Sequence, residues 1–179
     1  MMHRFAPYDY AAALGWQIVG LPYRGNRLTL YVLLPPKTLS LANAAREMNS
    51  TLFERLLDRT RPEKVNLSLP KFHVEYARPI TRYLAEMGMA PAFDPGADFS
   101  EMTLKTYGAY VRQVAVAAAM SVDEQGTSAT SIAAIEVRAE KVTVLPRNSA
   151  NVTVNRPFLV AIGEKPTNQI VFLGAVADP

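Results

Sequence analysis

The 179-residue sequence contains no cysteine, only two histidines and one tryptophan. Without cysteine, the chain has no disulfide framework, no thiolate nucleophile and no cysteine-ligated metal. His3 and His73 stand apart in the sequence, and neither has a second histidine or a metal-like spacing of carboxylates nearby. No glycine-rich phosphate motif or nucleophile-elbow motif is present either. We therefore expect no bound metal, no cofactor and no catalytic residues.

The sequence also has no long apolar run and no strong excess of one charge. Its longest purely apolar stretch, residues 114–120, is too short to span a bilayer. The formal net charge is only +3, and the basic residues are scattered along the chain. The first residues lack the apolar segment of a secretory signal. We expect neither a membrane span nor a nucleic-acid partner.

The patterns that are present predict strands and short helices in a mixed order. In the first third, residues 17–23 and 28–34 flank a glycine-containing turn, which predicts a β-hairpin. Helical spacing of apolar residues then predicts two short helices, over 41–48 and 52–57. The order has no βαβ regularity and no internal repeat, so an α+β fold is indicated.

Further elements are predicted in the second half. Alternating apolar residues predict a strand over 65–76 with a bend at Pro70, and a helix from Pro79 to Gly88 follows. We expect residues 92–102 to be a loop or a single helical turn, and the mostly apolar residues 111–122 to be a buried central strand. Two final strands, over 152–162 and 169–176, should form a core hairpin.

The segment between Gly126 and Pro146 contains neither glycine nor proline. It begins with small, weakly polar residues and ends with apolar residues alternating with charged or small ones, as in a strand with one buried face. One interpretation is an ordinary strand. The other is a strand-competent loop that starts at a hinge over residues 123–126, because long loops inside compact domains are uncommon and usually functional. The residues leave both open.

Three separated motifs resemble those of the serpins, a family of serine-protease inhibitors. The sequence around Asn155, Arg156, Pro157 and Phe158, with the ending over 172–179, is similar to the family's C-terminal signature. Residues 122–127 resemble the proximal hinge of inhibitory serpins. The stretches 69–72, 84–89 and 97–100 resemble a strand, a helix and a loop that follow the family's second β-barrel hairpin.

This resemblance implies an α+β, serpin-like fold of mixed, mostly antiparallel sheets with a few short helices, in which the N-terminal half of the fold is missing. It implies a single partial serpin domain over 1–179, with body strands and helices over 1–125, a hinge and reactive-centre loop over 126–150, and C-terminal core strands over 151–179. It also implies that the protein is not an enzyme. A serine-type endopeptidase inhibitor of this family acts as a suicide substrate, because its loop is cleaved and inserts into the central sheet.

The resemblance assigns roles to individual residues. Glu124 is implied to form an ion pair with Lys71 at the top of the sheet. With a period of two from Thr127, the early residues on one side are small, which favours insertion and an inhibitory hinge. Val116 departs from the family, because many members have a histidine there. The implied hinge residues are Glu124, Gly126, Thr127, Ala129, Ser131 and Ala133.

The cleaved bond has two possible positions. Counting forward from Gly126 by the family's usual loop length gives Glu140–Lys141, which we favour because insertion length governs inhibition. Counting back from the signature gives Pro146–Arg147. The implied partner is a trypsin-like or glutamate-specific serine protease, with a cysteine protease as a further option.

Two other functions stay open from the sequence. One is a non-inhibitory serpin-like binding module. The other is an inactive truncated fragment that self-associates through exposed sheet edges or needs the missing N-terminal half. For the parent protein the resemblance implies an extracellular or periplasmic location, whereas the chain itself carries no signal that assigns one.

Overall fold

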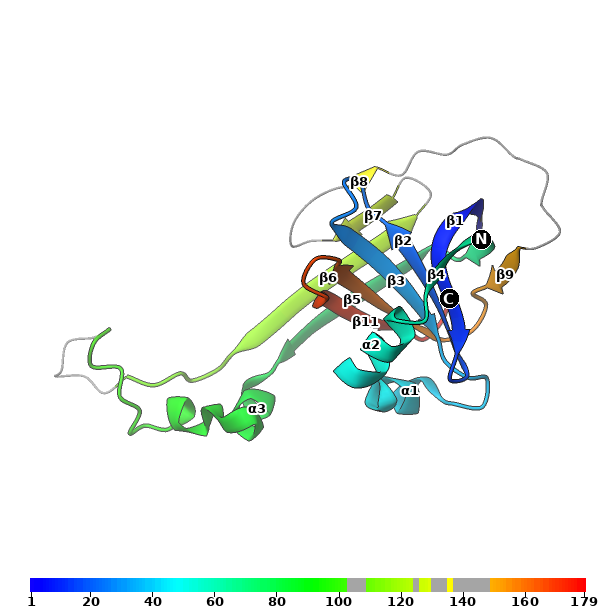
Figure 1. Cartoon of the computed structure of the whole chain (residues 1–179). Helices are drawn as coiled ribbons and strands as arrows, with labels where there is room; N and C mark the ends of the chain where they lie inside the picture. Colours follow the sequence, from blue (N-terminus) through cyan, green and yellow to red (C-terminus); the bar gives the residue numbers. More distant parts are fainter. Residues whose placement is uncertain (103–108, 124–125, 130–134, 137–148) are drawn as a thin grey trace. The chain divides into compact units, whose positions relative to one another are not determined.

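The computed structural model describes residues 1–102, 109–123, 126–129, 135–136 and 149–179 (Figure 1). The chain has two compact units. One comprises Met1–Val74 and Met120–Pro179, and the other comprises Glu75–Ala119. Among the described helices, none combines the length and the apolar character needed to cross a lipid bilayer.

A seven-stranded sheet forms the body of the larger unit. Its strand order is β11-β10-β3-β2-β1-β4-β9. Every neighbouring pair is antiparallel except β4 and β9, which are parallel. The strands are β1 (Met2–Ala13), β2 (Trp16–Pro22), β3 (Leu28–Leu34), β4 (Arg61–Leu69), β9 (Ala150–Thr153), β10 (Phe158–Glu164) and β11 (Gln169–Val176).

Two short helices, α1 (Leu41–Glu47) and α2 (Ser50–Leu57), pack on one face of this sheet (Figure 1). The side chain of Asn49 caps α2, since its Oδ1 accepts a hydrogen bond from the Leu52 N–H at 2.9 Å. Phe53 of α2 packs edge-on against Tyr31 of the sheet, with ring centroids 5.6 Å apart. The helices thus bury the cluster that also contains Trp16, Ile18, Leu33, Leu56, Leu159 and Ala161.

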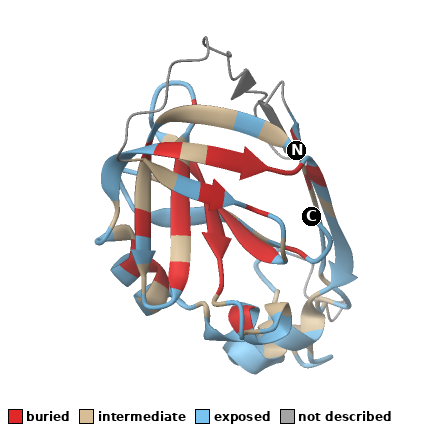
Figure 2. Cartoon of the chain, turned by 90° about the vertical axis from the view of Figure 1, so that its right-hand side faces the viewer, coloured by how far each residue is buried: buried red, intermediate tan, exposed pale blue. Residues whose placement is uncertain are grey.

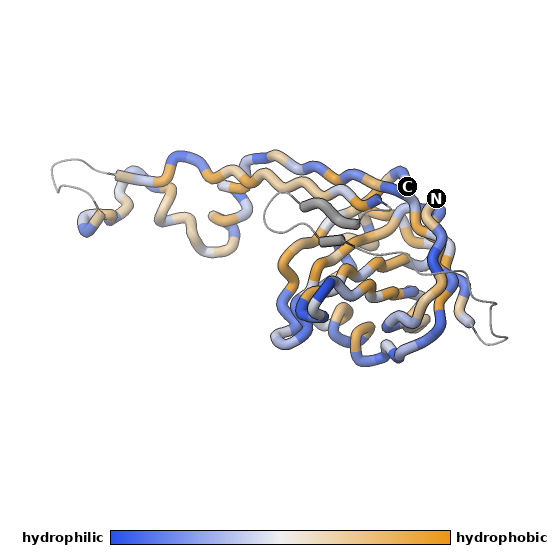
Figure 3. The backbone as a smooth tube through the Cα atoms, turned by 90° about the horizontal axis from the view of Figure 1, so that it is seen from above, coloured by the Kyte–Doolittle hydropathy of each residue, from blue (hydrophilic) through white to orange (hydrophobic). Residues whose placement is uncertain are grey.

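The larger core cluster lies on the other face of the sheet. Figure 2 shows the buried positions concentrated on the strands, and Figure 3 shows apolar and polar residues alternating along several of them. Fully buried members include Val19, Val32, Val65, Val152, Phe158 and Val160. Because the cluster draws on strands from both ends of the sequence, it joins the first 74 residues to the last 30.

A second sheet has the strand order β5-β6-β7-β8. Its strands are β5 (Phe72–Pro79), β6 (Ala115–Asp123), β7 (Gly126–Ala129) and β8 (Ile135–Glu136). β7 pairs antiparallel with β6 on one side and with β8 on the other. A hairpin therefore follows β6 directly.

The smaller unit contains α3 (Thr81–Leu84), the π-helical turn η1 (Ala85–Met89) and the 3-10 turn η2 (Ala90–Phe93). Gly88 has a φ of 102°, a conformation that favours glycine, within η1. The Thr81 hydroxyl accepts a hydrogen bond from the Val114 N–H at 2.9 Å. None of the described residues of this unit is buried.

Most of the elements predicted from the sequence are confirmed. The first hairpin is β2 and β3, the two short helices are α1 and α2, and the final hairpin is β10 and β11. The strand expected over 65–76 is bent at Pro70, where β4 ends and β5 begins two residues later. The region around Phe93 is a single helical turn followed by bends, as expected.

Three details were wrong. Pro79 ends β5, and the helix begins at Thr81, because the proline sits at the strand end rather than in the first helical turn. The strand expected over 111–122 begins at Ala115, and within β6 only Met120 and Val122 are buried, since these two alone reach the large core cluster. The strand expected over 152–162 is interrupted before Pro157, because β9 pairs parallel with β4 whereas β10 pairs antiparallel with β3.

Candidate functional site

The backbone of the predicted hinge segment pairs with β6 in an antiparallel hairpin. Asp123 is the register partner of Gly126, Val122 of Thr127, Ser121 of Ser128 and Met120 of Ala129. Only residues 124–125 separate the two strands, and they lie outside the described residues. The start of the glycine- and proline-free segment thus occupies the edge of β6 that faces away from β5.

The β6 side of this hairpin is anchored in the core. Met120 is 0% exposed and Val122 is 6% exposed, and both belong to the large cluster that contains Phe72 and Phe158. Register partners in an antiparallel pair share one face of the sheet. Positions 127 and 129 are therefore the register partners of two buried residues of β6.

A side-chain hydrogen bond joins β5 to β6 beside the hinge. The Nδ1 of His73 lies 2.7 Å from the Oγ of Ser121, and Ser121 is the register partner of Ser128 in β7. His73 is exposed and stands next to Phe72, whose side chain is buried. We interpret His73 as a structural residue that fixes the position of β6 relative to β5.

The signature residues connect the end of the chain to the rest of the fold. The Val154 N–H donates to the carbonyl of Ser68 at 2.8 Å. The Arg156 Nη2 donates to the carbonyl of Pro35 at 2.9 Å. Phe158 is fully buried and meets Phe72 edge-on, with ring centroids 5.3 Å apart. The signature and the Leu69-Pro70-Lys71-Phe72 motif, which are far apart in sequence, therefore meet in one core.

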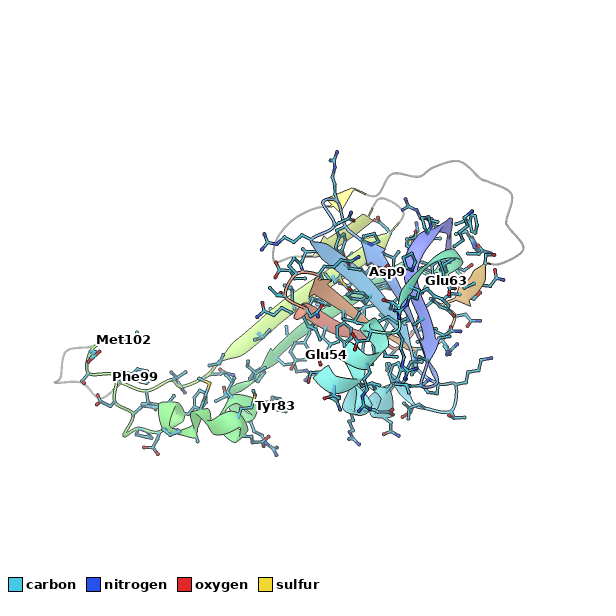
Figure 4. The ribbon with its side chains drawn as sticks, viewed as in Figure 1. Asp9, Glu54, Glu63, Tyr83, Phe99 and Met102 are labelled. Atoms are coloured by element: carbon cyan, nitrogen blue, oxygen red, sulfur yellow. The ribbon has the colours of Figure 1, made fainter. Side chains whose placement is uncertain are left out.

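Charged pairs hold the hairpin between β10 and β11. The Arg27 Nε lies 2.6 Å from Glu164 Oε1, and the Thr167 hydroxyl donates to Glu164 Oε2 at 2.6 Å. These hydrogen bonds lower the pKa of Glu164 below its ordinary value. The bond from Thr167 has the larger effect, and the bond from Arg27 comes next. Lys165 pairs with Asp9 of β1 at 2.8 Å, and Figure 4 shows Asp9 and Glu63 on the neighbouring strands β1 and β4.

The structure describes only part of the predicted site. Gly126, Thr127 and Ala129 lie in β7, and Lys71 is exposed just before β5. Glu124 lies outside the described residues, so its ion pair with Lys71 stays a prediction. The remaining predicted residues outside the described ranges are Ser131, Ala133, Glu140, Lys141, Pro146 and Arg147.

Sequence reasoning missed three connections around the site. They are the contact of Phe72 with Phe158, the hydrogen bond of His73 with Ser121, and the parallel pairing of β4 with β9. Each links segments at least 48 residues apart, and no local pattern in either segment specifies its partner. Across the part of the chain that the structure describes, no group of three or more histidine, aspartate or glutamate side chains is arranged to hold a metal ion.

Comparison with known proteins identifies the family. The family model for serpins, described as serine protease inhibitors, matches residues 1–179. The chain belongs to the serpin family. Its mixed sheets and few short helices are a serpin fold, as the sequence predicted.

Named serpins resemble the chain over almost all of its length. Intracellular coagulation inhibitor 2 of Tachypleus tridentatus is 28% identical over 96% of this chain and 41% of its own length. Human Serpin B13 is 33% identical over 99% of this chain and 44% of its own length. Human antithrombin-III is 29% identical over 100% of this chain and 39% of its own length. The chain therefore spans less than half the length of the curated serpins it matches.

Solved serpin structures agree with this assignment. The native state of Tengpin, a thermophilic serpin, superposes with a TM-score of 0.81 at 28% identity, covering 99% of this chain and 46% of Tengpin. Thyroxine-binding globulin in complex with thyroxine superposes with a TM-score of 0.80 at 23% identity, a likeness that shows the fold alone. Several named relatives are inhibitors rather than enzymes, among them a bovine leukocyte elastase inhibitor.

Proposed function

We propose that this chain supplies the hinge and the reactive-centre loop of a serpin that inhibits a serine-type endopeptidase as a suicide substrate. The single observation that carries the proposal is the pairing of β7 with the edge of β6 that faces away from β5, with only two residues between Asp123 and β7. A loop that is to insert as a strand must begin to pair at this edge, in antiparallel register, and β7 does so over four residues.

The composition of the hinge supports inhibition over a non-inhibitory binding module. Residues 126–131 are glycine, threonine, serine, alanine, threonine and serine, which are all small. Positions 127 and 129 are opposite the buried residues Val122 and Met120. Small residues at these two positions allow the strand to enter a sheet face that packs on the core, whereas bulky or charged ones would obstruct it.

Trapping a protease also requires a strand on the far side of the inserted loop. Among the described residues, β7 has β6 on one side and β8, which comes from the loop segment itself, on the other. We therefore expect the 179 residues alone to be cut as a substrate and to form no covalent, denaturant-resistant complex. The inhibitory step belongs to a serpin of the relatives' full length, for which an extracellular or periplasmic location remains part of the proposal.

The proposal is tested by mapping the first bond that proteases cleave. The chain is incubated with a trypsin-like enzyme and with a glutamate-specific enzyme, and products are followed by denaturing gel and mass spectrometry. Cleavage should begin after Glu140 with the glutamate-specific enzyme and after Lys141 with the trypsin-like enzyme, ahead of other acidic and basic sites. First cleavage outside residues 126–150 would contradict the assignment of the loop.

A matched pair of variants distinguishes the two positions of the reactive bond. Lys141→Gln removes the basic residue of the favoured position, and Arg147→Gln removes that of the alternative. If the forward count is right, only Lys141→Gln slows the first tryptic cut substantially. An upshifted band that survives denaturation would show that the chain traps the enzyme without a second flanking strand.

A further inference from the structure

The sequence contains three Asn-x-Ser/Thr motifs that the proposed inhibition does not use. They are Asn49-Ser50-Thr51, Asn66-Leu67-Ser68 and Asn151-Val152-Thr153. This motif is the acceptor for N-linked glycosylation when the asparagine is accessible on the surface. The structure places the three asparagines in very different surroundings, which allows them to be separated.

Asn49 lies at an exposed corner of the chain, between α1 and α2. Asn49, Ser50 and Thr51 are all exposed, so the whole motif lies at the surface of the described chain. The Oδ1 of Asn49 caps α2 by accepting from the Leu52 N–H at 2.9 Å. Because the capping atom is the oxygen, the Nδ2 can carry a sugar while the cap is kept.

Asn66 is only partly exposed, and its side-chain amide already has a hydrogen-bond partner. It lies in β4, which is paired with β1 on one side and with β9 on the other. Its Nδ2 donates to the Oδ1 of Asn151 at 3.1 Å. The hydroxyl residue of its motif, Ser68, is only 9% exposed and is hydrogen-bonded to the Nδ1 of His3 at 2.9 Å. Neither end of this motif is available to an enzyme in the folded chain.

Asn151 is exposed but is held by the sheet. Its strand β9 pairs in parallel with β4, and Val152 at the centre of the motif is 0% exposed. An acceptor segment has to fit into the active site of a transferase, so this motif would first have to leave the sheet and expose Val152. That step carries the cost of removing a buried valine from the core.

We propose that Asn49 is an acceptor for N-linked glycosylation and that the fold excludes Asn66 and Asn151. The donor is an oligosaccharide linked to a lipid pyrophosphate. In the transfer, the Nδ2 of Asn49 forms a bond to the anomeric carbon of the first sugar, while the bond from that carbon to the pyrophosphate oxygen breaks. The lipid pyrophosphate is the leaving group, and one proton of the amide passes to a base of the transferase.

The test uses the folded full chain, a purified single-protein oligosaccharyltransferase that recognises only Asn-x-Ser/Thr, and a lipid-linked oligosaccharide. Peptide mass mapping should find one glycan, on Asn49. Synthetic peptides spanning each motif serve as unfolded acceptors and should all be modified, which would assign the discrimination to the fold. Equal modification of the three asparagines in the folded chain, or an unmodified Asn49, would overturn the proposal.

Two variants separate the acceptor from the helix cap. Thr51→Ala removes the hydroxyl that the transferase reads and leaves Asn49 in place, so modification should be lost and the stability of α2 retained. Asn49→Asp keeps an oxygen that caps the helix but has no acceptor nitrogen, and it should also be unmodified. Circular dichroism of both variants checks the fold, and a glycan that persists at residues 45–54 in either variant counts against Asn49 as the site.

Discussion

At the scale of single residues, Phe158 joins two of the motifs by which the family is recognised. It is 0% exposed and packs edge-on against Phe72, so its removal would leave a cavity between the signature and β5. We expect Phe158→Ala to lower the free energy of unfolding by about 3–5 kcal/mol, measured by urea denaturation. Val171→Ala, at an exposed position, is the control and should change it by less than about 0.5 kcal/mol.

A loss of under about 1 kcal/mol for Phe158→Ala would mean that the site collapses to fill the space, against the packing described. A double-mutant cycle with Phe72→Leu and Phe158→Leu isolates the contact between the two rings. Aromatic pairs of this geometry contribute about 0.5–1.5 kcal/mol beyond the area that they bury.

Glu164 gives a pH-dependent prediction at the same scale. Hydrogen bonds from Thr167 and Arg27 lower its pKa in the folded chain below the ordinary value. A lowered folded pKa stabilises the protein fully above the unfolded pKa, and this stabilisation is lost as the pH falls through the folded pKa. Thr167→Val should raise the pKa of Glu164 and weaken the acid dependence of stability. Carboxyl NMR titration measures the change.

Thr167→Ser provides the control for this titration, because it keeps the hydroxyl that donates to Glu164. Thr167→Val replaces the hydroxyl by a methyl group, whereas Thr167→Ser removes only the methyl group. The pKa of Glu164 should therefore be raised in the first variant and unchanged in the second. An equal pKa in both variants would assign the lowered value to Arg27 alone.

At the scale of elements, the hairpin of β6 and β7 is the feature on which the proposed function depends. β7 pairs with β6 over four residues and with β8 over two, and Thr127 is paired on both sides. Thr127→Pro removes an N–H and fixes φ, and should speed hydrogen exchange of the Met120–Asp123 amides. The amides of β10 should exchange at unchanged rates.

Thr127→Ser is the conservative partner of this variant, and it should leave exchange in β6 as it is. If Thr127→Pro also left the hydrogen-exchange protection of β6 unchanged, β7 would not pair with β6 in solution. The proposed function would then lose the observation on which it rests.

The elements also show what sequence can specify. The pattern from Gln17 to Leu34 contains both strands and the turn between them, so the hairpin was predictable from local residues alone. β1 (Met2–Ala13) gave no comparable signal, because Pro7 and mixed polar residues interrupt its alternation and its partners lie in β2 and β4. Pairing with distant segments made it a strand.

The candidate site divides in the same way. The resemblance to a serpin hinge lies in the consecutive residues 122–127, so the local sequence was enough to suggest it. Gly126 and Thr127 lie in the strand that follows β6, and their role as a hinge stays a prediction. The register that sets Ala129 opposite Met120 could not be predicted in this way, because it depends on how the strands pair in the sheet. The position of the reactive bond remains a prediction from counting along the loop.

At the scale of the whole molecule, one edge of the seven-stranded sheet is apolar and unprotected among the described residues. β11 is an edge strand without charge or proline, and Ile170, Val171 and Leu173 are 41%, 66% and 55% exposed. Natural edge strands usually carry charges or prolines that prevent pairing with other chains. We expect the isolated chain to self-associate, as seen by sedimentation velocity.

The double variant Val171→Lys with Leu173→Lys should shift this self-association towards the monomer. Leu14→Lys changes a residue that is 51% exposed in the turn between β1 and β2, away from the edge, and should have no such effect. If both variants were equally monomeric, general solubility rather than the edge of β11 would explain the result.

The two ends of the predicted reactive-centre loop, residues 126–150, belong to different sheets. β8 belongs to the four-stranded sheet and β9 to the seven-stranded sheet, and residues 137–149 are the covalent connection between them. While that connection is intact, each end restricts the freedom of the other. Under the proposed function, hydrolysis of one peptide bond within it would separate the two ends. The upstream end could then pair with other strands while β9 stayed paired with β4. Cleavage would then be difficult to reverse, because re-forming the peptide bond would require both new chain ends to return to the same place.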